Sequence, residues 1–76
     1  MTNASSIITR VVESQIAEGE PLIVRETLER LLATGRSRDE ALRLISAVLA
    51  EEIYEILTTQ KPCNESRYTR ALSSIE

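Results

Sequence analysis

A long apolar segment that directly follows a helix-start signal constrains the fold more than any other feature. Residues 37–40 match a capping box, in which the Ser37 hydroxyl accepts a hydrogen bond from the Glu40 backbone N–H and the Glu40 carboxylate reaches back. In the ten residues that follow, 41–50, only Arg43 and Ser46 are polar. A helix that is apolar around so much of its circumference needs neighbours on two sides. The segment therefore predicts a central helix in an all-α fold.

Glycine, proline and asparagine divide the rest of the chain into further helices. Gly19 and Gly35 stand where apolar residues at helical spacing stop, and Pro21 suits the first turn of a helix. Pro62 prevents continuation of the central helix, and Asn64 is a good N-cap for a last one. The predicted helices cover residues 5–18, 21–34, 38–58 and 65–74. We expect one domain, residues 1–76, built as a compact bundle of four helices with the third and longest at its centre.

The size of the chain predicts self-association. It has 76 residues and 21 large aliphatic side chains, enough for one core. A chain this short buries only about 60% of its unfolded surface, so a lone monomer is marginally stable. The last helix offers only Tyr68, Leu72 and Ile75 as large apolar anchors. Some of the apolar surface of the third helix should then be left over, and a two-fold homodimer is the commonest arrangement that covers such a surface.

Charge and cysteine content narrow the environment and the partners. The net charge is −3 and the pI is about 5.0, whereas proteins that bind nucleic acid through phosphates are usually basic. The single cysteine, Cys63, cannot form an internal disulfide, which favours a reducing compartment. No signal peptide is recognised at the N-terminus, and no apolar run approaches the roughly 20 residues of a transmembrane helix. We expect a cytoplasmic protein that does not associate with membranes.

Five short segments occur in an order and at a spacing that point to a family. They are residues 12–16 (VESQI), 27–31 (TLERL) with Gly35, 38–41 (RDEA), 52–57 (EIYEIL), and Lys61-Pro62 followed by Tyr68. In these segments the chain resembles a family of small uncharacterised bacterial proteins, all helical and of unknown function. The resemblance implies the fold rather than an activity. Members of the family carry histidines at the positions of Ser5, Thr9 and Arg43, and this chain has no histidine. The resemblance thus implies that any metal site built from those imidazoles is lost here.

The residue types disfavour catalysis and cofactor binding. Without histidine, the commonest general base near neutral pH is missing. Cys63 has Pro62 and Asn64 as neighbours, with no base beside it, so we expect it to pack as a small apolar side chain. Lys61 lies in a connector with no apolar enclosure. We therefore expect a non-enzymatic protein with no cofactor.

An acidic group on the third helix is interpreted as a solvated face. Glu51 and Glu55 stand one helical turn apart and Glu52 lies beside them. Carboxylate sites for Ca²⁺ or Mg²⁺ need more oxygen ligands and usually a loop, and di-metal sites in bundles need Glu-x-x-His pairs. The sequence predicts no metal site.

Two classes of function remain. The first is a protein–protein interaction module that self-associates, with a possible contact surface at the margins of the main apolar faces: Ile23, Val24, Leu44, Val48 and Tyr54. These side chains would not be available if the other helices covered them fully. The alternative is a DNA-binding regulator that uses a helix-turn-helix-like segment around Gly35–Glu40, with Arg36, Arg38 and Arg43 as anion or nucleic-acid contacts.

Overall fold

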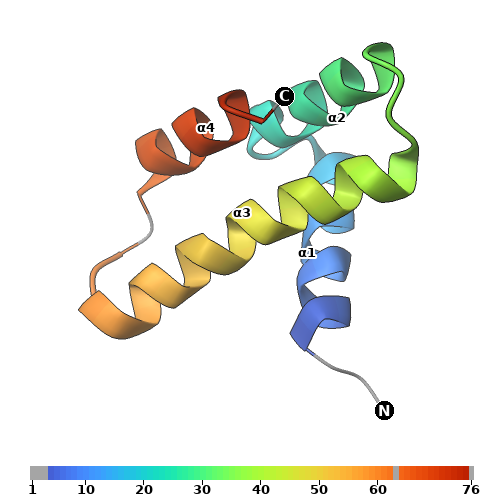
Figure 1. Cartoon of the computed structure of the whole chain (residues 1–76). Coiled ribbons are helices and arrows are strands. Elements are labelled where there is room, and N and C mark those ends of the chain that lie inside the picture. The colour runs from blue at the N-terminus through green and yellow to red at the C-terminus, as the bar shows by residue number, and fades with distance from the viewer. Residues whose placement is uncertain (1–3, 63, 76) are drawn as a thin grey trace.

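The computed structural model describes residues 4–62 and 64–75, with side chains from residue 7 onward. Within these residues the chain forms four helices: α1 (Ala4–Glu18), α2 (Leu22–Ala33), α3 (Arg38–Thr59) and α4 (Glu65–Ser73). The longest helix, α3, contacts each of the others (Figure 1). Helices α2 and α4 pack against each other on one side of α3, while α1 crosses α3 and extends away from the pair. The predicted helical bundle with a central third helix is confirmed.

The first turn of α3 is held by the predicted cap. The Glu40 backbone N–H donates to Ser37 Oγ at 3.1 Å, and Ser37 Oγ donates to Glu40 Oε1 at 3.3 Å. The other end of α3 lies one residue beyond the predicted position. There Gln60 takes a left-handed conformation (φ +57°), and its N–H donates to Ile56 O at 2.9 Å. A polar residue in this conformation closes the helix before Pro62 is reached.

The two glycines end α1 and α2 in the way that their sequence positions indicate. Gly19 and Gly35 have φ values of +70° and +97°. After α2, the Arg36 N–H donates to Leu31 O and the Gly35 N–H to Leu32 O, which is the bond pattern of a Schellman motif. Both turns reverse the chain within a few residues, which brings consecutive helices into contact.

The boundaries of α2 and α4 differ slightly from those predicted. Pro21 is the residue before α2 rather than part of its first turn, and α4 ends at Ser73, one residue early. Asn64 caps α4 as expected, because its Oδ1 accepts a hydrogen bond of 3.0 Å from the Arg67 N–H. These shifts move no side chain from one face of a helix to another.

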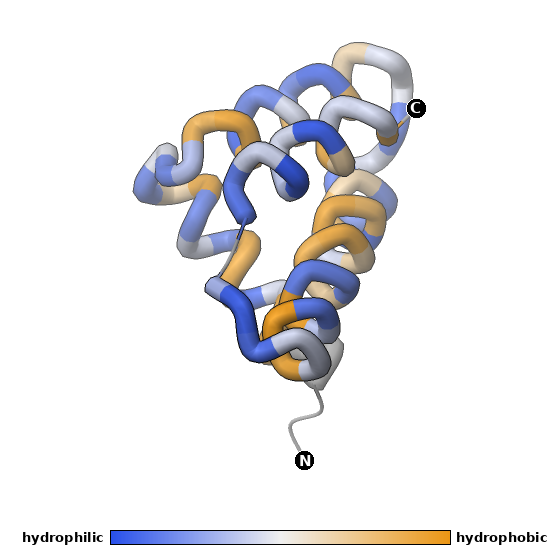
Figure 2. The backbone as a smooth tube through the Cα atoms, turned by 90° about the vertical axis from the view of Figure 1, so that its left-hand side faces the viewer, coloured by the Kyte–Doolittle hydropathy of each residue, from blue (hydrophilic) through white to orange (hydrophobic). Residues whose placement is uncertain are grey.

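All four helices contribute to one core, and this corrects part of the predicted interaction surface. The buried apolar side chains are Val12, Val24, Leu28, Leu31, Ala41, Leu42, Ile45, Leu49, Tyr68 and Leu72. Val24 is fully buried in this core, so it does not belong to an outer surface. Ile23, Leu44 and Val48 are half-buried against the core. Figure 2 shows apolar residues recurring along the helices that pack together.

Two arginines of α2 bind the ends of other helices. Arg25 donates to Ile16 O at 2.8 and 3.0 Å and to Ala17 O at 3.1 Å, at the end of α1. Arg30 donates to Leu72 O at 2.9 Å and to Ile75 O at 2.6 Å, at the end of α4. The last carbonyls of a helix lack partners within the helix and carry partial negative charge, so guanidinium groups stabilise them. Helix α2 therefore fixes the ends of both α1 and α4.

Candidate interaction surface

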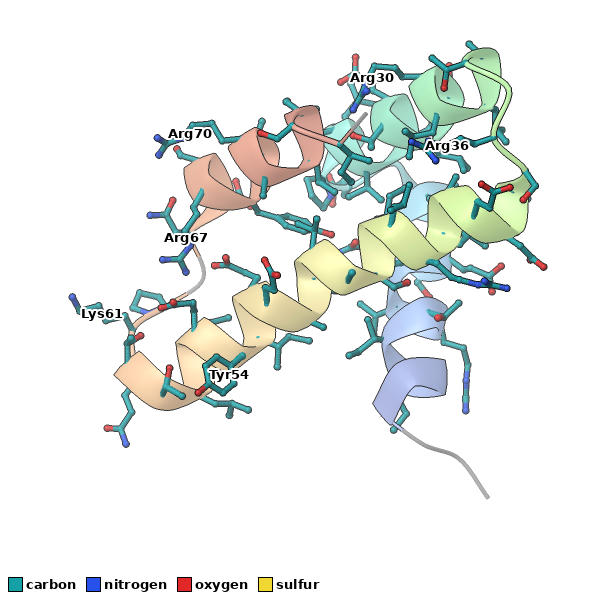
Figure 3. The ribbon with its side chains drawn as sticks, in the orientation of Figure 1. Arg30, Arg36, Tyr54, Lys61, Arg67 and Arg70 are labelled. Atoms are coloured by element: carbon teal, nitrogen blue, oxygen red, sulfur yellow. The ribbon has the colours of Figure 1, made fainter. Side chains whose placement is uncertain are left out.

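The arginines around the α2–α3 turn do not form one open basic site. Arg36 pairs with Glu40 (3.9 Å between Nη1 and Oε2), and Arg38 pairs with Glu13 of α1 (3.1 Å between Nη1 and Oε1). Arg43 is exposed and forms no ion pair within the described residues. Two of the three predicted anion contacts are thus neutralised by carboxylates of the same chain. Figure 3 shows Arg36 beside the turn, above α3.

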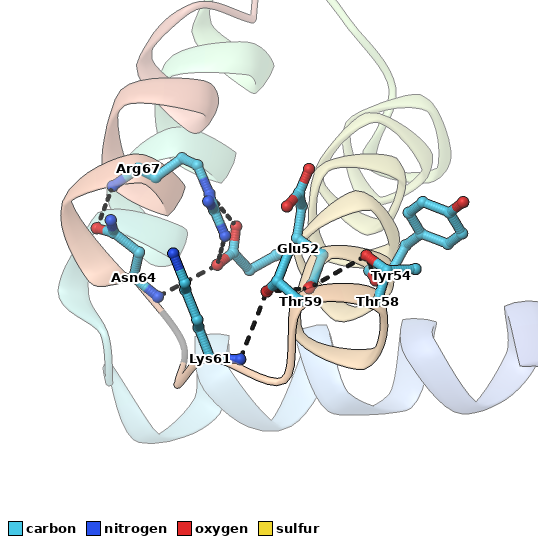
Figure 4. A network of polar contacts seen from close by, with 8 residues as sticks. Glu52, Tyr54, Thr58, Thr59, Lys61, Asn64 and Arg67 are labelled. Atoms are coloured by element: carbon cyan, nitrogen blue, oxygen red, sulfur yellow. Dashed lines mark hydrogen bonds and ion pairs between the residues drawn. The ribbon is translucent and has the colours of Figure 1, made fainter.

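Glu52 was predicted to lie on a solvated face with Glu51 and Glu55, and for Glu52 this is wrong. Its side chain is 5% exposed. Arg67 Nε donates to Glu52 Oε2 at 3.0 Å, Arg67 Nη2 donates to Oε1 at 2.7 Å, and the Asn64 N–H also donates to Oε1 at 3.2 Å (Figure 4). Two parallel bonds from one guanidinium give strong and directional binding. The pair fastens the start of α4 to α3, which is a structural role.

A signal for this pair exists in the sequence. Ile45, Leu49, Glu52 and Ile56 recur at spacings of three and four residues, which places them on one face of α3. A carboxylate in the middle of an apolar face requires a cation to pair with it once it is buried. Arg67 stands three residues after the helix cap Asn64 and so lies in the first turn of α4, where it reaches that carboxylate.

A second polar contact that sequence reasoning missed joins α1 to α4. The buried Tyr68 hydroxyl donates to Gln15 Oε1 at 3.2 Å. A buried phenol needs such a partner, so the amide on α1 allows the largest ring of the core to be packed without an unsatisfied hydroxyl. This contact belongs to the interior, whereas the Glu52–Arg67 pair borders a pocket of about 450 Å³ between α3 and α4, with the Arg67 side chain 45% exposed.

The described residues contain no group of three His, Cys, Asp or Glu side chains arranged to hold a metal ion. Lys61 is exposed in the connector between α3 and α4, and no described helix is both long and apolar enough to span a bilayer. Cys63, expected to be a packed hydrophobe, and the side chain of Ser5 lie outside the described residues.

Large apolar side chains reach the surface along α1 and the second half of α3. Tyr54 and Leu57 of α3 are 67% and 72% exposed, and Ile7 and Val11 of α1 are 52% and 42% exposed. These four residues are called the α1/α3 surface. In Figure 1 the two helix segments that carry them diverge from their crossing point like the arms of a V. Tyr54 points away from α4 and from the Glu52–Arg67 pair (Figure 4).

A pocket of about 180 Å³ lies between α1 and α3 where the two arms meet. It is lined by Ile8, Thr9, Arg43, Ser46, Ala47 and Ala50. Thr9 and Arg43 bring a hydroxyl and a guanidinium to the pocket. Because Ile53, Tyr54 and Leu57 follow Ala50 at spacings of three, four and seven residues, they continue this side of α3 beyond the pocket. The pocket and the exposed residues of α3 thus lie along one side of this helix.

Of the five residues predicted as an interaction surface, only Tyr54 is prominently exposed, and Leu57, Ile7 and Val11 were not named. The predicted residues were chosen at the margins of the apolar faces. The exposed ones instead lie where a helix extends past its neighbour, and a single helix pattern does not contain that information.

Comparison of the chain with protein-family models, with curated proteins and with solved structures gave no match.

Proposed function

We propose that this chain is a non-enzymatic protein–protein interaction module that self-associates as a homodimer, with the α1/α3 surface as its contact area. The observation that carries the proposal is the exposure of large apolar side chains on two helices that pack against each other. Six large apolar side chains of the described residues are prominently exposed, and four of them belong to the α1/α3 surface. Exposed patches of this kind are typical of contact sites rather than of free surface.

Burial of the exposed apolar side chains would supply the free energy of association. Burial of side chains such as Tyr54 and Leu57 contributes about 1.5–3 kcal/mol each. A second copy of the chain can bury these apolar side chains without any other partner. A reducing cytoplasm is the compartment that suits a chain with the single cysteine Cys63.

The mass in solution tests the proposal. Light scattering at micromolar concentration should give about 17 kDa, twice the 8.5 kDa of one chain. Leu57→Lys should shift the mass to that of one chain, because a charge within an apolar contact must be desolvated. Leu22→Lys is the matched control: Leu22 is 55% exposed but lies on α2, outside the α1/α3 surface. A wild-type mass of one chain at 100 μM, or equal effects of the two variants, would contradict the proposal.

The DNA-binding regulator remains the alternative, and Arg43 is the residue that favours it. Arg43 is exposed at the surface, whereas Arg36 and Arg38 are paired with Glu40 and Glu13. Titration with generic duplex DNA at low salt separates the two functions, because non-specific binding to phosphates is strongest there. Binding weaker than about 0.1 mM would contradict the regulator.

A further inference from the structure

One face of α3 carries a regular pattern that the bundle covers only in part. Ala47, Ala50, Tyr54 and Leu57 follow one another at spacings of three, four and three residues. This is the spacing of the a and d positions of a heptad repeat, which form the contact seam between two paired helices. These four residues are called the α3 stripe. Ala50 is half-buried and the other three are exposed, so the stripe is accessible along its length.

The α3 stripe is complementary to itself in one orientation only. Its first half has two small side chains, Ala47 and Ala50, and its second half has two large ones, Tyr54 and Leu57. When two copies are antiparallel, a single register places Leu57 opposite Ala47 and Tyr54 opposite Ala50, and each large side chain fills the space above a small one. In a parallel pair, large side chains would face large ones while alanines faced alanines, which leaves the layers unevenly packed.

We propose that two copies pair through antiparallel α3 stripes about a two-fold axis near residue 52, with Leu57 of each copy against Ala47 of the other. This inference rests on the proposed self-association and specifies its geometry. An interface of this kind is isologous, since the same residues are used by both copies, and it closes at two chains. Self-complementary size and spacing favour a second copy over an unrelated protein as the occupant of this face.

The charges near the stripe agree with the antiparallel orientation. Arg43 precedes Ala47 by one turn and would lie near the end of α3 of the second copy. That end carries no basic residue in its last turn, and its carbonyls carry partial negative charge. Lys61, just beyond the same end, points to the α4 side in Figure 4, away from Tyr54, so it does not face the incoming Arg43. A parallel pair would instead place Arg43 of one chain beside Arg43 of the other.

Helix α1 would enlarge the contact. The pocket shared by Ile8 and Thr9 with Ala47 and Ala50 places α1 beside the first half of the α3 stripe. The two-fold axis then places α1 of one copy beside Tyr54 and Leu57 of the other. Ile7 and Val11, which are partly exposed, would gain burial there. The second copy would then cover the exposed side chains of α1 and of the second half of α3 together.

Cysteine cross-linking tests the register. Ala47→Cys and Leu57→Cys are made separately in a Cys63→Ser background and oxidised alone and as a mixture. In the antiparallel pair, residue 47 of one chain lies about 15 Å along the helix axis from residue 47 of the other chain. This is too far for a disulfide, which needs Cα atoms within about 7 Å. The mixture should therefore give at least about tenfold more linked dimer, of mixed mass, than either variant alone. The Cys63→Ser chain alone is the control and should give none.

The outcomes separate the inference from the proposed function. Efficient linking of each variant with itself would show a parallel pair and overturn the inference, while self-association would stand. Absence of linking in every combination, with a light-scattering mass of two chains, would place the interface elsewhere and also overturn it. A mass of one chain for the wild type would overturn both. Ala50→Cys mixed with Tyr54→Cys repeats the measurement in the adjacent layer, so failure of one variant to fold does not leave the register undecided.

Discussion

The two halves of α3 both carry apolar residues at helical spacing, but these residues differ in burial. In the first half Ala41, Leu42 and Ile45 are buried and the helix start is capped by Ser37. In the second half, α4 covers one side through Glu52, while Tyr54 and Leu57 remain exposed. An apolar residue at helical spacing therefore does not by itself indicate burial. What decides burial is whether another helix is long enough to pass over it, and α1 and α2 both meet α3 and then diverge from it.

The largest expected effect is in the first half. Ile45→Ala should lower the free energy of unfolding by about 2–5 kcal/mol, because the fully buried side chain leaves a cavity that the neighbours fill only in part. Leu57→Ala should change it by less than about 0.5 kcal/mol in a monomeric chain, because Leu57 is mostly exposed. Urea unfolding of both variants in monomeric conditions checks this contrast. Similar losses would show that the two halves of α3 are equally buried.

An intermediate effect is expected where α4 attaches. Arg67→Ala should cost about 1–3 kcal/mol, since the buried Glu52 carboxylate would lose the donors of its cation partner. The loss should be smaller than for a fully buried pair, because the Arg67 side chain is 45% exposed and water reaches the site. Arg70→Ala, one turn later on the exposed side of α4, is the control and should cost less (Figure 3). If the control costs as much, the Glu52–Arg67 pair is not what holds α4.

The smallest effect concerns the helix start. Ser37→Ala should lower the melting temperature by an amount that corresponds to about 0.5–2 kcal/mol, because the Glu40 N–H loses its acceptor. Ser14→Ala serves as control, since Ser14 is exposed in the middle of α1. Thermal unfolding followed by circular dichroism at one protein concentration is sufficient. A melting temperature equal to that of the control would mean that the capped turn does not limit the stability of α3.

The sequence predicts most of the fold because its helix boundaries are marked by local chemistry. Ser37 and Asn64 cap helices, and the turns at Gly19 and Gly35 need the left-handed conformation that glycine adopts without a Cβ penalty. The side chains whose burial was predicted wrongly have a different explanation. Val24 and Glu52 depend on which helix packs over which face, and this is set by contacts between residues far apart in the chain. Leu57 is exposed because α1 diverges before reaching it, a feature that no spacing within α3 encodes.

The guanidinium groups of α2 should also influence the order in which the molecule opens. Helix ends normally fray first, and their amide protons exchange quickly with solvent. Here the final carbonyls of α1 and α4 are held by Arg25 and Arg30, so local opening should begin at the other ends of those helices. Amide exchange would then be slow in the last turn of α4. Helix α2 would then limit the opening of both helices, while Tyr54 and Leu57 in the second half of α3 stay exposed.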